Sequence, residues 1–257
     1  MNSLPLPLPL PLPLVNVFNT PYELWTKRRA TFEEIQESGN IHLMIKEKRI
    51  VRICNHIDAA KYILSKQHDE SFENFIETQL IQSTDFNNMR GAMPPQTPKS
   101  LSDYQRRYRP HTFLLVSSDI NNVGKTLSEG QILFHGGFWP NPSIGSEIIT
   151  SRPFSTSFSP QMALRNANWN GKAYDAGEIN LFVLRVVSPK TKAFIFRIKG
   201  TEKGHEKEVL FSSGAKLTLK RKELIDATTV AYKVDPNNNI NLLSKPAPSY
   251  ILEVDIS

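Results

Sequence analysis

The order of helix-like and strand-like segments is the strongest constraint on how this chain can fold. In the first half, apolar residues recur at helical spacing, as where Ala59, Ala60, Ile63 and Leu64 would share one helix face. From Gly130 onward, short runs of β-branched and aromatic residues alternate with Gly, Pro and Asn, which is typical of strands. Helices followed by strands predict an α+β fold with a mixed or antiparallel sheet.

The expected elements can be placed approximately. We expect helices that begin near Thr31, at an Asp58 cap and near Phe72, and one or two more between Tyr104 and Val123. The segment Ile50–Ile53 fits either a strand or the start of a helix. We expect strands over Gln131–His135, Ile179–Val187, Ala193–Ile198, Glu208–Phe211, Lys216–Lys220, Thr229–Val234 and Ile251–Val254.

Proline placement divides the chain. Leucine and proline alternate from Leu4 to Leu14, which forbids a helix and predicts an extended segment; no Lys or Arg precedes it, as a secretory signal peptide would require. Three prolines between Met93 and Lys99 predict a loop. We therefore expect a disordered leader over residues 1–20, a helical N-terminal region over 21–100 that packs on the core, and a strand-rich core over 101–257.

The composition limits the classes of partner that we expect. The net charge of +6 favours an acidic protein face, a nucleotide or a nucleic acid. The single cysteine, Cys54, excludes an internal disulfide and is expected to be a small buried hydrophobe. Its spacing to His56 and the other histidines suggests no metal site.

No apolar run approaches the roughly 18 residues of a membrane span. A nucleic-acid interface rests only on the charge and on the cluster Arg106–Arg109, without interleaved aromatics, and ranks last.

Three segments of the strand-rich half carry chemistry-bearing residues: Leu133–Gly137 with His135, Phe154–Ser159 with Ser-Thr-Ser, and Gly204–Phe211 with Glu-Lys-Glu. Alone, each fits a structural role. On a strand, however, Glu206 and Glu208 share one face while Lys207 takes the other. Because an apolar run follows at once, Glu208 would lie where the strand enters the core. A partly desolvated carboxylate there could stabilise a positive charge.

In order and spacing these segments resemble the mono-ADP-ribosyltransferase toxins, whose signature is a basic residue, then Ser-Thr-Ser, then Glu-x-Glu. Gly145–Ile149 resembles the family's strand before Ser-Thr-Ser, Met162-Ala163 its short helix, and Leu181–Leu219 its paired strands and acceptor loop. Phe86–Gly91 resembles its Asn-x-x-Leu-Arg motif, with methionine for leucine. The resemblance covers about half of the chain, Phe72 to Leu219, and implies a split mixed or antiparallel β core, with 101–257 as the catalytic part.

One departure concerns the first motif. The arginine-using members have arginine where this chain has His135, and the diphtheria-toxin and poly-ADP-ribose polymerase branch has histidine there. That branch, however, has tyrosine in place of Ser155. The chain therefore combines features of both branches, which affects the expected NAD contacts more than the expected reaction.

The resemblance implies roles for single residues. Glu208 would stabilise the cationic ribose that forms as nicotinamide leaves, and Ser155 would orient Glu208 or the ribose. Glu206 would position or deprotonate the acceptor. The NAD contacts would come from His135 on a ribose hydroxyl, the main chain of Gly136 on the nicotinamide amide, Thr156 in the Ser-Thr-Ser segment, and Arg90 on the pyrophosphate.

The function implied is transfer of ADP-ribose from NAD, the co-substrate, to a side chain of a host protein by a secreted bacterial toxin or effector. A specialised secretion system would deliver this protein, as a monomer, into the host cytoplasm. Arginine and hydroxyl acceptors both stay open, including threonine or serine on host regulators such as ubiquitin or a GTPase. Two alternatives are an NAD glycohydrolase and a catalytically inactive module of the same fold that binds NAD or protein.

Overall fold

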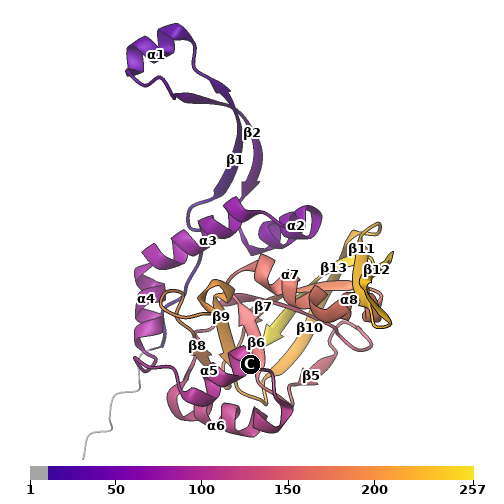
Figure 1. The fold of residues 1–257 in the computed structure, drawn as a ribbon. Helices are drawn as coiled ribbons and strands as arrows, with labels where there is room; N and C mark the ends of the chain where they lie inside the picture. The colour runs from indigo at the N-terminus through magenta and orange to yellow at the C-terminus, as the bar shows by residue number, and fades with distance from the viewer. Residues whose placement is uncertain (1–10) are drawn as a thin grey trace, which may run out of the picture.

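A single nine-stranded sheet forms the centre of the computed structural model, which describes residues 11–257 (Figure 1). Every neighbouring pair in it is antiparallel except β7 and β13, which are parallel. The predicted α+β class with a mixed, largely antiparallel sheet is therefore confirmed. In spatial order the strands are β3 (Lys125–Thr126), β8 (Lys192–Ile195), β9 (Glu208–Phe211), β6 (Phe154–Ser157), β4 (Ile132–Gly137), β7 (Ile179–Val186), β13 (Ser249–Ile256), β10 (Lys216–Asp226) and β5 (Glu147–Ile149).

The sheet is nearly divided at its middle. Strands β4 and β6 share one register pair, Phe134 with Ser157, whereas β6 and β9 pair over four residues and β4 and β7 over six. The pairing between the β3–β8–β9–β6 half and the β4–β7–β13–β10–β5 half is therefore much shorter than the pairing within each half. Ser-Thr-Ser lies on β6 and Glu208 starts β9, so both lie on the same side of this joint.

Helices pack around the sheet. They are α2 (His56–Lys66), α3 (Glu70–Gln82), α4 (Thr84–Gly91), α5 (Lys99–Arg106), α6 (Phe113–Val123), α7 (Pro160–Asn168) and α8 (Lys172–Ala176), with 3-10 turns η1 (Pro110–Thr112), η2 (Trp169–Gly171) and η3 (Gly204–Glu206). The expected apolar face of α2 is buried, but Asn55 caps this helix and the predicted cap, Asp58, lies in its first turn. Helix α7 lies against β4 and β7, and α6 lies against β8.

The N-terminal region is not all helical, contrary to the expectation for residues 21–100. Strands β1 (Tyr22–Arg29) and β2 (Met44–Ile53) form an antiparallel hairpin that projects from the body and carries α1 (Phe32–Ser38) at its end (Figure 1). The expected helix start at Thr31 is confirmed, since its hydroxyl accepts from the Glu34 N–H and the Glu34 carboxylate accepts from the Thr31 N–H.

The expected leader of residues 1–20 is wrong in its second half, while residues 1–10 lie outside the described part of the chain. Val15, Val17 and Phe18 are buried in the core. The Gln131 side chain accepts from the Val15 N–H and donates to the Val15 carbonyl, so this extended segment is tied to the start of β4. The Leu-Pro alternation ends at Leu14, and the apolar residues after it are free to pack.

Most expected strands are confirmed, but β1, β3, β6 and β12 (Asn238–Pro246) were not expected. The two-stranded sheet of β11 (Val230–Asp235) and β12 closes through a turn containing Pro236 and Asn237. The asparagine-rich sequence of β12 is not typical of a strand, so this strand was not predicted.

Cys54 is exposed rather than buried, because it lies between the end of β2 and the cap of α2. Within residues 11–257, no helix is long and apolar enough to cross a membrane, and no group of His, Cys, Asp or Glu is arranged to hold a metal.

Candidate active site

The carboxylate of Glu208 is the centre of the candidate site. This residue begins β9 and is only 6% exposed. The Ser155 hydroxyl donates to its Oε1 at 2.6 Å, and the Gln105 amide donates to its Oε2 at 2.7 Å. Ser157 is the register partner of Glu208, so Ser155 lies two residues further along β6 on the same face, within reach of the carboxylate. The expected pairing of Ser155 with Glu208 is therefore present in the structure.

Burial sets the acidity of this carboxylate. Desolvation is the main cause that raises the pKa of Glu208 to about 7, and the negative charge of Glu206 acts in the same direction. The hydrogen bonds from Ser155 and Gln105 act in the opposite direction, because they stabilise the ionised form. Glu208 is thus a buried carboxylate that ionises near neutral pH and has two donors fixed on its two oxygens.

His135 on β4 is linked to the same serine through the main chain. Its Nδ1 lies 2.7 Å from the Ser155 carbonyl, and since a carbonyl only accepts, Nδ1 carries the proton. Burial lowers the pKa of His135 to about 4, so the ring is neutral at pH 7. The ring packs against Phe154 at 4.3 Å between centroids. Nε2 is then an acceptor, suited to a hydroxyl group and unable to supply the positive charge of an arginine.

Two of the expected NAD-contacting residues have structural roles in the described chain. The Thr156 hydroxyl is buried and donates to the Val209 carbonyl at 2.7 Å, on the face of β6 opposite Ser155. A side chain on Gly136 would come within 1.8 Å of the Ala163 carbonyl, so glycine is required here for α7 to pack on β4. Both residues therefore have a role in packing, and their expected contacts with NAD stay predictions.

The Glu-Lys-Glu segment does not form one continuous strand, contrary to the sequence expectation. Glu206 ends the η3 turn, Lys207 has a left-handed φ of 48°, and the strand starts only at Glu208. Glu206 is partly exposed and forms an ion pair with Lys203 at 3.3 Å. Its carbonyl accepts from the Ser157 hydroxyl at 2.7 Å, which fixes the turn beside the Ser-Thr-Ser strand. Glu206 is close enough to Glu208 to influence its pKa, so the two carboxylates share one region.

Lys207 anchors this turn to α3. Its side chain is 1% exposed, and its Nζ lies 2.7 Å from Glu73 and 3.1 Å from Glu77. The other oxygen of Glu73 accepts from the Ser159 hydroxyl at 2.5 Å. The partly buried Glu73 carboxylate of α3 therefore holds both the residue between the two glutamates and the residue that caps α7.

Arg90 on α4, the residue expected to meet the pyrophosphate, contacts β8 and the loop after α4 rather than Glu208 or Ser155. Its guanidinium lies over the Phe194 ring, 5.7 Å from the centroid, and one of its terminal nitrogens donates to the Pro94 carbonyl at 3.0 Å. The Nε is buried without a hydrogen-bond partner. Burial and the charge of Arg197 lower the pKa of Arg90. An unsatisfied buried donor next to a second cation is an environment that favours an anion.

Sequence reasoning missed Gln105. This residue lies on α5, more than a hundred positions before Glu208, and nothing in the segment Lys99–Arg106 marks it as a site residue. Only the packing of α5 over the end of β9 brings the two together. Gln105 both completes the hydrogen bonding of Glu208 and covers it, which explains how a charged residue at a strand end is buried.

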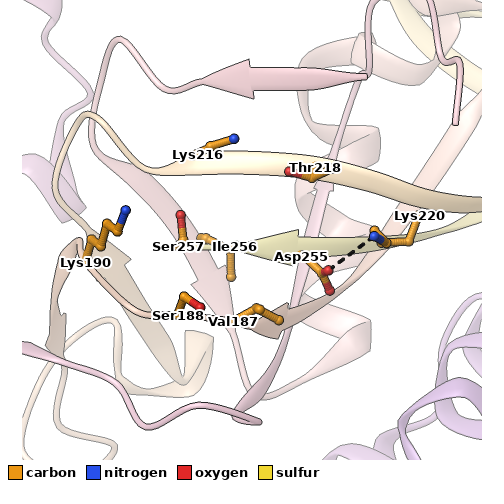
Figure 2. Close-up of a pocket in the computed structure, with 9 residues that line it drawn as sticks. All are labelled: Val187, Ser188, Lys190, Lys216, Thr218, Lys220, Asp255, Ile256 and Ser257. Atoms are coloured by element: carbon orange, nitrogen blue, oxygen red, sulfur yellow. Dashed lines mark ion pairs between the residues drawn. The ribbon is translucent and has the colours of Figure 1, made fainter. Parts of the chain in front are cut away.

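The cavity shown in Figure 2 lies apart from these residues. It is bordered by the ends of β7, β10 and β13, and the side chains of Lys190, Lys216 and Lys220 surround it. Lys216 and Lys220 already face acids, since Lys216 pairs with Glu147 and Lys220 with Asp255. None of the predicted site residues lines this cavity, and Glu208 lies instead beneath α5.

Comparison with known proteins gives weak structural similarity only. No protein-family description matches the chain, and no curated protein matches it. A crystal structure of the ADP-ribosyltransferase Vis, from Vibrio splendidus, with agmatine is 12% identical over 74% of this chain and 86% of that chain, with a TM-score of 0.41. C3stau2 from S. aureus with NAD is 11% identical over 66% and 92%, with a TM-score of 0.41.

A further match is the enzymatic component C2-I of the C2-toxin from Clostridium botulinum. It is 11% identical over 74% of this chain and 48% of that chain, with a TM-score of 0.36. At these identities and scores the similarity assigns neither a family nor an activity. Any functional assignment therefore depends on the residues of the site itself.

Proposed function

We propose that this protein is a mono-ADP-ribosyltransferase that cleaves NAD and transfers ADP-ribose to a side chain of another protein. The observation that carries the proposal is the buried Glu208 carboxylate, held by the Ser155 hydroxyl within the ordered set His135, Ser-Thr-Ser and Glu-x-Glu. A carboxylate that is held in place and shielded from water can stabilise the positive charge that develops on a sugar.

The reaction proceeds by loss of nicotinamide. The bond between the ribose C1′ and the nicotinamide nitrogen breaks, and both of its electrons leave with the neutral nicotinamide. The ribose is left with oxocarbenium character, and the ionised Glu208 stabilises that charge while accepting a hydrogen bond from a ribose hydroxyl. A lone pair of the acceptor then forms the new bond to C1′, and the acceptor proton passes to Glu206.

The other site residues bind the dinucleotide in this proposal. His135 is neutral, so its free Nε2 accepts a hydrogen bond from a ribose hydroxyl. Arg90, with its unpartnered Nε, meets the pyrophosphate, and the nearby Arg197 adds to the positive charge there. In the structure Gln105 occupies Oε2 of Glu208, so the ribose hydroxyl has to displace this amide or share the oxygen with it.

The acceptor is a side chain on a host protein, and Arg, Thr and Ser all satisfy the chemistry. In this proposal the protein is a bacterial toxin or effector that is secreted and acts in the host cytoplasm. Hydrolysis of NAD is the second candidate function, because a buried carboxylate that stabilises the sugar cation serves water as an acceptor equally well.

Nicotinamide release tests the proposal. Glu208→Gln removes the charge with almost no change in volume, and we expect the rate to fall about a hundredfold to a thousandfold, the range seen when one transition-state stabilising group is lost. Glu129→Gln serves as the matched control, because Glu129 is exposed and forms no ion pair within the described residues. Retention of most of the release by a folded Glu208→Gln protein would rule the role out.

Glu206→Gln separates transfer from hydrolysis. In cell lysate with labelled NAD, we expect this variant to lose protein labelling while it keeps most of its nicotinamide release. Equal losses of both signals would argue against an acceptor role for Glu206. If the wild-type protein releases nicotinamide but labels no protein in any lysate, the glycohydrolase function is the correct one.

A further inference from the structure

The projecting hairpin is a prominent element that contributes no residue to the proposed catalytic site. We call residues 22–53 the arm, which consists of β1, the tip (residues 30–43) and β2. Figure 1 shows that the arm leaves the body near α2 and α3 and extends away from the central sheet. Of the eighteen residues in its two strands, only Tyr22 and Ile53, at the base, are buried.

Such an element gains little stability from its own packing. A two-stranded hairpin is marginal in water unless one of its faces is covered. Helix α1 at the tip has no buried residue, and Phe32 and Ile41 are 70% and 74% exposed. Met44 and Ile50 on β2 are also exposed. Large apolar side chains left exposed along a projecting element are typical of a surface that a partner covers.

The strands of the arm are strongly basic. They hold seven cations and two acids, so their formal charge is 7 − 2 = +5, and the whole chain has a net charge of +6. The tip has the opposite sign, because its charged groups are Glu33, Glu34 and Glu37, or −3. The arm is therefore basic along its length and acidic at its end.

Four of these cations lack an acidic partner. Arg28 pairs with Glu34 and Glu47, while Glu23 is shared by Arg49 and Arg52. By contrast, no ion pair within residues 11–257 involves the other four, Lys27, Arg29, Lys46 and Lys48. Lys27 and Lys46 lie directly opposite each other across the hairpin.

A like-charge cross-strand pair is unfavourable unless an anion lies nearby. Trp25 lies on the same side, with the Lys46 Nζ 5.6 Å and the Arg49 guanidinium 5.9 Å from its ring centroid. One face of the hairpin thus presents an aromatic ring and closely spaced positive charges.

We infer that the arm is a docking surface for a protein partner with an acidic patch. The unpaired lysines along the strands meet the carboxylates of that patch, and the exposed apolar side chains of the tip meet an apolar spot beside it. The inference deepens the proposed function and rests on it in one respect: a transferase that modifies proteins needs a surface that selects its target. Interfaces commonly combine such charge complementarity with an apolar centre.

The charge order of the arm favours a protein over other anionic partners. Glu33 and Glu37 at the tip form no ion pair within the described residues and would be repelled by lipid phosphates or by a nucleic-acid backbone. A tip that inserts into an anionic membrane would instead carry cations beside its apolar residues. A protein surface can present both signs of charge and an apolar spot at matching positions.

The test compares two triple variants of the full chain. Lys27→Ser/Lys46→Ser/Lys48→Ser lowers the formal charge of the two strands of the arm from +5 to +2. Lys66→Ser/Lys125→Ser/Lys190→Ser, the matched control, removes three exposed lysines from the body; both variants lower the net charge from +6 to +3. The probe is a fluorescein-labelled copolymer of glutamate and tyrosine, and its affinity is measured by fluorescence anisotropy at physiological salt.

We expect the arm variant to bind the copolymer about tenfold more weakly and the control to stay within about twofold of the wild type. Phe32→Ser/Ile41→Ser should weaken binding of the copolymer but leave binding of a glutamate homopolymer unchanged. Equal losses in the two triple variants would overturn the inference. So would tighter, arm-dependent binding of polydeoxythymidine or of phosphatidylserine vesicles, since either result identifies another class of partner.

Nicotinamide release by the same variants separates this inference from the proposed function. The triple variants should keep the wild-type rate, because none of the substituted lysines touches the site of Glu208. Copolymer binding does not require NAD, so it can succeed or fail independently of catalysis. Absence of nicotinamide release in the wild type would overturn the transferase function and leave the binding result intact.

Discussion

The proposed activity depends on the ionisation state of the Glu208 carboxylate. Burial favours its protonated form, while the donors on its two oxygens favour the ionised form. With a pKa of about 7, the carboxylate is only partly ionised at neutral pH. A residue that stabilises a cation has to be ionised, so activity depends on this balance.

The pH profile of nicotinamide release is therefore the first prediction. We expect release to rise with pH through about 7, as Glu208 ionises. Gln105→Ala removes a donor that stabilises the ionised form, so it should raise the pKa and shift the rise by about one unit to higher pH. Gln96→Ala, an exposed substitution in the preceding loop, is the control and should leave the profile unchanged. An unshifted profile in Gln105→Ala would show that this hydrogen bond does not hold the carboxylate during turnover.

At the scale of elements, the site depends on how α3 and α5 are placed against the neighbouring strands β6 and β9. Helix α5 supplies Gln105 and covers Glu208, and α3 supplies Glu73, which holds Lys207. Neither helix belongs to the sheet. The geometry of the two glutamates thus depends on packing between the N-terminal helices and the strand-rich half.

The buried ion pair of Lys207 and Glu73 yields the second prediction. Lys207→Met leaves the Glu73 carboxylate without its cation, and we expect the free energy of unfolding to fall by about 3–5 kcal/mol. Adding Glu73→Gln removes the uncompensated charge and should restore much of the loss. Urea unfolding of the single and double variants measures both effects. Equal destabilisation of the two proteins would mean that the lysine contributes through its packing rather than its charge.

At the scale of the whole molecule, the site carries a cost in stability that depends on pH. The pKa of Glu208 is about 7 in the folded protein, against an ordinary value of 4.5. Below pH 4.5 the group is protonated in both the folded and unfolded states and changes nothing. Between pH 4.5 and 7 the unfolded chain releases this proton while the folded protein keeps it, so stability falls by on the order of 3 kcal/mol, and it falls no further above pH 7.

Glu208→Gln removes that cost. We expect the variant to be more stable than the wild type at pH 8, by up to about 3 kcal/mol, and equally stable near pH 4.5. Thermal or urea unfolding at the two pH values measures the difference. Equal stability at pH 8 would mean that the carboxylate is solvated, and its assigned environment would be wrong.

The sequence predicted the strand-rich half better than the helical half. Strands with strong apolar runs, such as β7 and β9, lie where they were expected, and Ser155 pairs with Glu208 as the motif order implied. The arm was missed because its strands carry alternating charges and lack a buried face. Gln105 could not be predicted, because its role arises only from the packing of a distant helix.

Motif residues can also have packing roles. Gly136 is required by the approach of α7, and Thr156 is bound to the main chain of Val209, while their expected contacts with NAD stay predictions. Glu206 and Glu208 were expected on one strand, but the left-handed backbone of Lys207 separates a turn from the strand start. Spacing alone does not distinguish these cases, since it carries no information about backbone conformation.

A crystal structure with NAD bound tests the central claim most directly. We expect a carboxylate oxygen of Glu208 within about 2.6–3.0 Å of a ribose hydroxyl, with Gln105 moved from Oε2 or sharing that oxygen with it. Arg90 should lie at the pyrophosphate. A dinucleotide bound elsewhere, with Glu208 still covered by Gln105 and out of reach of the sugar, would contradict the account.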